Sequence, residues 1–131
     1  NEFIITGGSW LSLMSIRKND DIDIIISESF RSQYDEFLSG IGQEIRDEVI
    51  RHIDKSRKHG DKIMSLAKSK NFNDLWKYHT VEVNGYKFIK FDLYMKYKKP
   101  RKRAKDKDDR RRISDFFKEK RHLLAEYKGC F

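Results

Sequence analysis

The stretch ITGGSWLSLMSIRKNDDIDIIIS, residues 5–27, combines two apolar runs, a glycine pair and a group of aspartates. Residues 2–6 are predicted to form a short buried strand that ends at Gly7-Gly8, and apolar residues at helical spacing follow as far as Ile16. Residues 22–26 are mostly β-branched and predict a second strand. The nearly continuous apolar character of this strand favours a central position in a sheet.

Two aspartates, Asp21 and Asp23, stand at alternate positions at the start of the second strand. Alternate residues of a strand point to the same face, so both carboxylates can reach one divalent cation while Ile22 and Ile24 anchor the strand in the core. Asp20 is expected to face the other way. Carboxylate ligands with positions left open for phosphates suit Mg²⁺ or Mn²⁺.

The glycine turn, Gly7-Gly8, is a candidate phosphate site. Backbone N–H groups before a helix can bind phosphate, and the Ser9 hydroxyl adds a further donor. Taken alone, Asp-x-Asp is more typical of a solvated turn or strand edge, and Gly-Gly of an ordinary turn. The order strand, Gly-Gly-Ser, helix, Asp-Ile-Asp is difficult to explain by packing alone. It predicts a phosphate cradle that faces a metal-binding acid pair.

A long helical region follows. Apolar residues recur at three- and four-residue steps over residues 30–53, which predicts an amphipathic helix capped by Ser29. Gly40 and Gly42 are expected to kink or break this helix, and Gly60-Asp61 to interrupt it. Helical spacing then resumes until the sequence KNFND.

The second half of the chain adds a hairpin and two helices. Asn84-Gly85, between two β-rich runs, is the strongest hairpin signal in the sequence. A short helix is expected from Asp92, and a closing helix after Pro100. Its apolar residues are Ile113, Phe116, Phe117, Leu123, Leu124 and Tyr127. We therefore expect one α+β domain over residues 1–131, a small mixed β-sheet flanked by helices with a long helical insert after the second strand.

The charge of the chain is concentrated in one segment. The formal net charge is +8, from 29 Lys and Arg against 21 Asp and Glu. Residues 96–112 hold 11 of the basic residues and only 3 of the acidic ones, so the rest of the chain is balanced. Such a segment attracts nucleic acid or a nucleoside triphosphate by releasing counterions, and it is also typical of a solvated helix or loop.

Cysteine content and hydropathy indicate the cellular setting. Cys130 is the single cysteine, so this sequence forms no disulfide within itself and no cysteine-based metal site, which fits a reducing cytoplasm. No apolar run approaches the roughly 20 residues of a membrane helix, and no signal peptide is visible. We expect a cytoplasmic protein without a membrane partner. Because the sequence begins at Asn1 rather than methionine, an N-terminal element could precede it.

Residues 6–24 resemble the signature of the DNA polymerase β-type nucleotidyltransferase superfamily, in which a hydrophobic residue and Gly-Ser precede Asp-hydrophobic-Asp-hydrophobic. Gly8, Ser9, Asp21 and Asp23 occupy the motif positions. The resemblance implies a minimal nucleotidyltransferase fold, in which the Gly-Ser turn holds the nucleotide phosphates and the acid pair binds Mg²⁺. These are the roles that the residue types themselves suggest.

Residues 81–113 resemble the later region of the abortive-infection-type nucleotidyltransferases, which include toxins and related bacterial and phage proteins. In that group a Val-x-Val-x-Gly hairpin leads to an acid-Leu-x-x-x-Lys helix and then to a basic Lys-Asp-x-x-Asp motif. The matching residues are Asp92, Leu93, Lys96, Arg103, Lys105, Asp106 and Asp109.

The resemblance implies roles for several of these residues. As catalytic residues beside Asp21 and Asp23, Lys96 is expected near the triphosphate and Asp106 close to the acid pair. The nucleotide-binding residues are expected to be Gly7, Gly8, Ser9, Arg17 and Lys105. The helical stretch 30–77 has no counterpart in the resemblance.

Two departures from the family pattern stand out. Trp10 replaces the small residue usual after Gly-Gly-Ser/Thr, which would narrow the nucleotide pocket. The superfamily also has a third carboxylate on a later strand. Asp92 is the candidate for this metal ligand if the strand continues, and otherwise a helix cap, with Glu82 a weaker candidate.

Histidines and aromatic residues offer further candidates. The four histidines lack ligand spacing and are expected to be ordinary surface or core residues; they are His52, His59, His79 and His122. Four aromatic residues could stack a base, although aromatics at helical spacing are more typical of a core; they are Trp76, Tyr78, Tyr94 and Tyr97.

The sequence thus predicts Mg²⁺-dependent transfer of NMP from an NTP to an acceptor, with release of pyrophosphate. The basic segment favours RNA, tRNA included, as the acceptor. The toxin-like relatives suggest a cognate antitoxin as a further partner. Two alternatives stay open: a catalytically silent nucleotide-binding or antitoxin-like module, and a basic nucleic-acid-binding protein with no enzymatic role.

Overall fold

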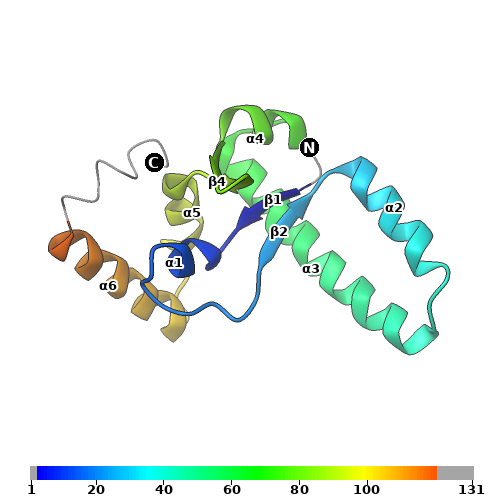
Figure 1. Cartoon of the computed structure of the whole chain (residues 1–131), viewed down its shortest axis with the longest axis horizontal. Coiled ribbons are helices and arrows are strands. Elements are labelled where there is room, and N and C mark those ends of the chain that lie inside the picture. Colours follow the sequence, from blue (N-terminus) through cyan, green and yellow to red (C-terminus); the bar gives the residue numbers. More distant parts are fainter. Residues whose placement is uncertain (1–2, 121–131) are drawn as a thin grey trace.

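The computed structural model describes residues 3–120 and contains a four-stranded mixed sheet in the order β2-β1-β4-β3 (Figure 1). The strands are β1 (Phe3–Thr6), β2 (Asp23–Ile26), β3 (Thr80–Val83) and β4 (Tyr86–Ile89). β1 is antiparallel to β2 and parallel to β4, and β3 is antiparallel to β4.

Six helices accompany the sheet in the described residues. They are α1 (Ser9–Leu13), α2 (Glu28–Leu38), α3 (Gln43–Ala67), α4 (Phe72–Tyr78), α5 (Phe91–Lys98) and α6 (Ala104–Glu119). Within residues 3–120, none is long and apolar enough to span a bilayer. Figure 1 shows α2 and the first half of α3 projecting to one side of the sheet, with α1, α5 and α6 grouped on the other. The α+β class, the mixed sheet and the helical insert after the second strand are confirmed.

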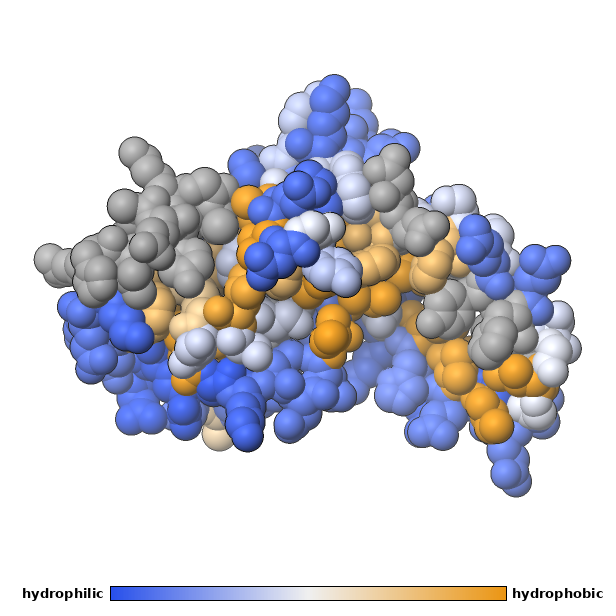
Figure 2. All heavy atoms as spheres, in the orientation of Figure 1, coloured by the Kyte–Doolittle hydropathy of each residue, from blue (hydrophilic) through white to orange (hydrophobic). Residues whose placement is uncertain are grey.

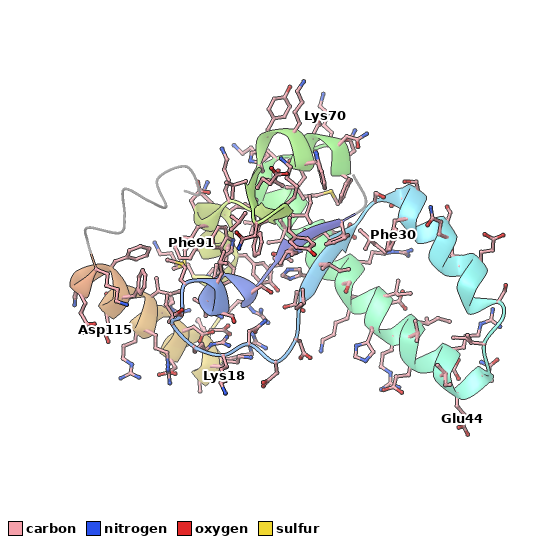
Figure 3. All side chains as sticks on the ribbon, in the orientation of Figure 1. Lys18, Phe30, Glu44, Lys70, Phe91 and Asp115 are labelled. Atoms are coloured by element: carbon pink, nitrogen blue, oxygen red, sulfur yellow. The ribbon has the colours of Figure 1, made fainter. Side chains whose placement is uncertain are left out.

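The core lies where the sheet meets α1, α3, α5 and the apolar face of α6. Its central member is Trp10, which is fully buried and whose indole Nε1 donates a hydrogen bond of 2.7 Å to the Ile89 carbonyl. Phe91 packs edge-on against Trp10 and lies among the side chains between α5, α1 and α6 (Figure 3). Trp10 therefore fixes α1 to the end of β4, and it lies in the core instead of narrowing a pocket.

The second strand is an edge strand, so the prediction of a central position is wrong. β2 pairs only with β1 among the described strands, and it begins at Asp23. Ile22, expected in the core, precedes the strand and is 72% exposed. The apolar run still has a partner because α3 covers β2, where Ile25 is buried against Gly60.

The helical insert also differs from the prediction in detail. The chain breaks between α2 and α3 around Gly40 and Gly42, as expected. The cap of α2 is Ser27 and not Ser29, since the Ser27 Oγ accepts a hydrogen bond from the Phe30 N–H at 3.2 Å. At the start of α2, Phe30 is half-buried, and apolar side chains are visible between α2 and α3 in Figure 2.

Helix α3 runs without interruption through Gly60, so the predicted break at this glycine is wrong. A Cβ atom added to Gly60 would lie 3.2 Å from Cγ2 of Ile25. This proximity is the reason for the glycine, because it lets the helix approach the strand closely. Glycine here serves packing between elements and not termination of the helix.

Two helices, α4 and α6, differ from the prediction in where they begin. The sequence KNFND, where the helical spacing ends, starts α4, with the Asn71 side chain accepting the Asp74 N–H at 2.9 Å. Helix α6 begins at Ala104 and so includes the second half of the basic segment. The last apolar residues of the predicted closing helix, together with one histidine and the cysteine, lie outside the described residues; they are Leu123, Leu124, Tyr127, His122 and Cys130.

The hairpin predicted at Asn84-Gly85 is confirmed. Both residues have positive φ, 51° and 84°, as a two-residue turn between twisted strands requires. It joins β3 to β4 and so fixes the register of the strand that lies beside β1.

We predict that Gly60→Leu destabilises the protein by about 1–3 kcal/mol, because the added side chain overpacks the junction with β2. The loss should exceed the gain in helix propensity, which favours leucine by about 0.8 kcal/mol. Urea unfolding measures the difference. Ser65→Leu, on an exposed position of the same helix, is the control and should not be destabilised. Equal stability of the two variants would contradict the role given to Gly60.

Candidate functional site

The glycine turn after β1 lies against the carboxylate of Asp23. Thr6, the last residue of β1, pairs with Asp23 at the start of β2. Gly7 follows with φ of 70°, a left-handed conformation that glycine adopts without strain. A Cβ on Gly7 would stand 2.6 Å from Oδ2 of Asp23. The structure therefore brings together the turn and one member of the predicted acid pair.

Gly8 is enclosed by the loop that leads to β2. A Cβ on Gly8 would lie 2.5 Å from Oδ1 of Asn19 and 3.3 Å from Nη2 of Arg17. The next residue, Ser9, carries a buried hydroxyl that has no hydrogen-bond partner within residues 3–120. Buried hydroxyls are almost always paired, so this one is suited to a ligand. The predicted residues Gly7, Gly8, Ser9 and Arg17 are thus close neighbours.

Asp21 lies outside the strand. It is exposed in the loop before β2, and its backbone carbonyl accepts a hydrogen bond from the Asn19 side chain. The regular alternation of a strand does not extend to Asp21, so its orientation relative to Asp23 is set by the loop. The loop is exposed at this point and Figure 3 shows Lys18 on it, beside α6.

A histidine and two cations complete the surroundings of Asp23. The His59 Nε2 lies 3.3 Å from the Thr6 Oγ1, and its ring packs edge-on against Tyr97 with centroids 4.6 Å apart. The same Tyr97 ring carries the Lys62 Nζ at 5.6 Å and the Arg101 guanidinium at 5.0 Å.

The pKa of His59 depends on these neighbouring charges. Burial lowers the pKa of His59 below its usual value; the negative charge of Asp23 opposes this shift, and the positive charges of Arg101 and Lys62 add to it. His59 is therefore neutral at pH 7. A carboxylate and two cations act on one imidazole from different elements, so they share one site.

The basic segment contains a buried group of charges. Asp109 is 1% exposed and receives both Nε and Nη2 of Arg17, at 2.6 and 2.9 Å. The Lys98 Nζ lies 2.7 Å from Asp109 and 3.0 Å from Asp106. Arg103 completes the group with a 2.7 Å bond to Asp106. We call these five side chains the ion cluster.

The ion cluster keeps its carboxylates ionised. Hydrogen bonds from Arg103 and Lys98 hold the pKa of Asp106 well below its usual range, against the effect of burial. Burial raises the pKa of Asp109, but the hydrogen bonds from Arg17 and Lys98 outweigh it and the net shift is downward. Asp106 and Asp109 join α6 to α5 and, through Arg17, to the loop before β2. Lys105, predicted to bind nucleotide, is exposed on α6.

Lys96 and Asp92 lie in a separate cavity of about 420 Å³. It is lined by the ends of α3 and α4 and the start of α5, and its polar residues are Lys68, Tyr78, His79, Lys90, Asp92 and Lys96. None of Gly7, Gly8, Ser9 and Asp23 lines it. In residues 3–120 no three acidic, histidine or cysteine side chains converge as metal ligands, so Asp92 as third carboxylate stays a prediction.

Sequence reasoning overlooked His59, Lys62 and Arg101. His59 has no ligand spacing, Lys62 is one of many lysines on α3, and Arg101 is one of eleven basic residues in its segment. The spacing of one helix turn between His59 and Lys62 was the available signal, but only the packing of α3 on β2, which brings His59 to Thr6, makes it informative. Of the four aromatic candidates, Tyr94 and Tyr97 are buried and Tyr78 is 58% exposed.

Comparison with known proteins adds no assignment. No model of a protein family matches the chain, and neither the curated proteins nor the solved structures yield a match.

We predict that Asp109→Asn destabilises the protein by about 3–5 kcal/mol at pH 7, because it leaves Arg17 and Lys98 without their shared partner. The folded-state pKa of Asp109 is lowered, so its contribution is present above the unfolded pKa of about 3.9 and is lost as the pH falls below it. Urea unfolding from pH 7 to pH 3 should show the difference in stability between the two proteins narrowing once the pH falls below about 3.9. Asp108→Asn removes a half-exposed carboxylate of the same helix, which pairs with the surface residues Arg111 and Arg112, and should change little at any pH; a similar loss in both variants would refute the assignment.

A second prediction concerns His59. Replacing Asp23 with Asn removes the negative charge that opposes the lowered pKa of His59, so the pKa should fall further. An NMR titration of the imidazole measures it. Asp20→Asn, nearby in the same loop, is the matched control and should leave the titration unchanged. If the two variants titrate alike, Asp23 does not face His59.

Proposed function

We propose that the chain is a minimal nucleotidyltransferase of the DNA polymerase β type, which transfers NMP from an NTP to an acceptor hydroxyl. The observation that carries the proposal is the proximity of Asp23 to Gly7. It joins the carboxylate expected to bind metal to the turn expected to bind phosphate, which are sixteen residues apart in the sequence. Packing alone gives no reason to hold a charged side chain against a left-handed glycine turn.

The residues around the turn fit a triphosphate. The orphaned hydroxyl of Ser9 can donate to a phosphate oxygen, and the absence of side chains at Gly7 and Gly8 lets Asp23 and the loop before β2 approach the turn closely. Lys62 and Arg101, which act electrostatically on the same imidazole as Asp23, can offset the negative charge of the phosphates.

The proposal includes a divalent cation at the acid side of the site. Asp23 would hold it together with Asp21, and such hard oxygen ligands suit Mg²⁺, which keeps several positions for water and phosphate oxygens. When bound there, the ion neutralises charge on the phosphates and makes the acceptor hydroxyl more acidic.

The transfer itself exchanges one phosphorus–oxygen bond for another. The acceptor oxygen bonds to the α-phosphorus, the bond from the α-phosphorus to the bridging oxygen breaks, and pyrophosphate leaves with that electron pair. The hydroxyl proton passes to solvent or a neighbouring base. The chain contributes orientation of the triphosphate and compensation of charge, the two effects that dominate catalysis of phosphoryl transfer.

The catalytically silent alternative is favoured by two observations. No third carboxylate stands beside Asp23 in the described residues, and Arg17, expected to contact nucleotide, is already held by Asp109. A silent module would bind NTP without turning it over.

Label transfer distinguishes these functions. The protein is incubated with each α-labelled NTP, Mg²⁺ and total cellular RNA, beside the Asp21→Asn/Asp23→Asn double variant. We expect labelled RNA from the wild type and a loss on the order of 100-fold or more in the double variant, because the charge of the phosphates is no longer neutralised. Asp20→Asn, which keeps the acid pair, should remain active. Absence of label with every NTP, together with Mg²⁺-independent NTP binding, would leave the silent module.

A further inference from the structure

The sheet places the candidate site and the basic cavity at the same edge. β1 and β4 are parallel, and each pairs antiparallel with its outer neighbour. The residues at or next to one end of the sheet are therefore, in strand order, Asp23, Gly7, Lys90 and His79. The Lys90 N–H donates to the His79 carbonyl at 2.9 Å, which closes the far end of this row. Asp23 lies at one end of this row of residues, and the cavity lined by Lys90 and His79 lies at the other end.

The length of the row follows from two independent dimensions. Three strand spacings separate β2 from β3, which gives about 14 Å. Along α3, His59 contacts Thr6 beside Asp23, and Ala67 lines the cavity eight residues later; at about 1.5 Å per residue the distance is about 12 Å. Stacked nucleotides rise by about 3.4 Å each, so about four of them span this distance.

The lysines of the cavity attract a polyanion. Lys68, Lys90 and Lys96 line it against one carboxylate, Asp92. None of these four side chains takes part in the ion cluster. By contrast, both exposed arginines at the middle of α6, Arg111 and Arg112, are paired with Asp108 at 2.6 and 2.8 Å, which reduces their value for binding phosphate.

Tyr78 adds an aromatic surface to the same cavity. Its side chain lines the cavity and the residue is 58% exposed, whereas Tyr94 and Tyr97 are buried in the core. The Lys77 Nζ lies 5.2 Å from the Tyr78 ring centroid, over one face of the ring. The other face can stack a base, and stacking beside lysines is the general mode of binding single-stranded nucleic acid.

We propose that this cavity binds single-stranded RNA and holds the strand whose end reaches Asp23. The inference rests on the proposed function for the choice of an acceptor strand. The choice of RNA over DNA rests on Asp92, since a carboxylate among lysines repels phosphate but accepts a hydrogen bond from a 2′-hydroxyl. In this arrangement Lys96 contacts the acceptor strand, and the triphosphate is left to Lys62 and Arg101.

Fluorescence anisotropy with labelled 12-nucleotide oligo(rU) tests the site, in EDTA and without NTP. Tyr78→Ala should weaken binding about 5- to 150-fold, as expected for loss of one stacked base, and Tyr78→Phe should restore it. Tyr86→Ala is the matched control, because Tyr86 is 55% exposed but begins β4, at the opposite end of the sheet. Circular dichroism melting checks that each variant is folded.

Salt dependence locates the side chains that bind phosphate. Lys90→Gln/Lys96→Gln should reduce the slope of log K against log salt by about 1.4, or about 0.7 for each phosphate that is no longer neutralised. Arg111→Gln/Arg112→Gln represents the rival surface on α6 and should leave the slope unchanged.

Oligo(dU) of the same length should bind more weakly than oligo(rU), and Asp92→Ala should remove that difference. Sensitivity to the α6 pair but not to Tyr78 or the cavity lysines, or equal affinity for the two oligonucleotides, would overturn the proposal.

The outcome is separable from that of the proposed function. RNA binding that depends on Tyr78, without label transfer from any NTP, would keep the RNA site and reject the transferase. Label transfer to RNA with an unchanged KM for RNA in Tyr78→Ala would keep the transferase and reject this site.

Discussion

The arrangement of the C-terminal half depends on the burial of two carboxylates in α6. Asp106 and Asp109 are 0% and 1% exposed, and burial of an ionised group is tolerated only with close partners. Lys98 from α5 bridges both acids, and Arg17 reaches Asp109 from the loop before β2. Since removal of one partner leaves an uncompensated charge, the ion cluster specifies one position for α6. That position in turn fixes the loop that encloses Gly8.

Because of the ion cluster, the net charge of the basic segment overstates the positive charge that is free to bind a partner. Counted along the sequence, residues 96–112 look like an exposed basic segment, but its three acids are all paired with cations and Arg110 donates to the Lys98 and Arg101 carbonyls. Part of the basic excess therefore holds the fold together. Two cations at the sheet edge come from outside this segment. Lys62 lies on α3, and Lys90 follows the end of β4.

Local signals made much of the fold predictable. The turn at Gly7-Gly8, the hairpin at Asn84-Gly85 and the apolar spacing of the helices each depend on neighbours a few residues away, and each was confirmed. The errors arose where distant segments meet. Nothing near Gly60 in the sequence shows that Ile25 packs against it, and the apolar run of β2 looks central because the part of α3 that covers it, around Gly60, lies more than thirty residues further along.

The same distinction between local signals and contacts of distant segments applies to the candidate site. Gly7, Gly8, Ser9 and Asp23 were predictable because they lie within one stretch of the sequence, whereas His59 reaches the site only through the packing of α3 on the sheet, and Arg101 only through its contact with Tyr97 of α5. Helix α3 links the two ends of the sheet edge: His59 contacts Thr6, the strand partner of Asp23, and Ala67 and Lys68 line the cavity. The close approach of α3 to β2 at Gly60 sets the height of both groups above the sheet. A shift of α3 would therefore displace the cations at Asp23 and the wall of the cavity together, which couples the packing of one glycine to the geometry of both sites.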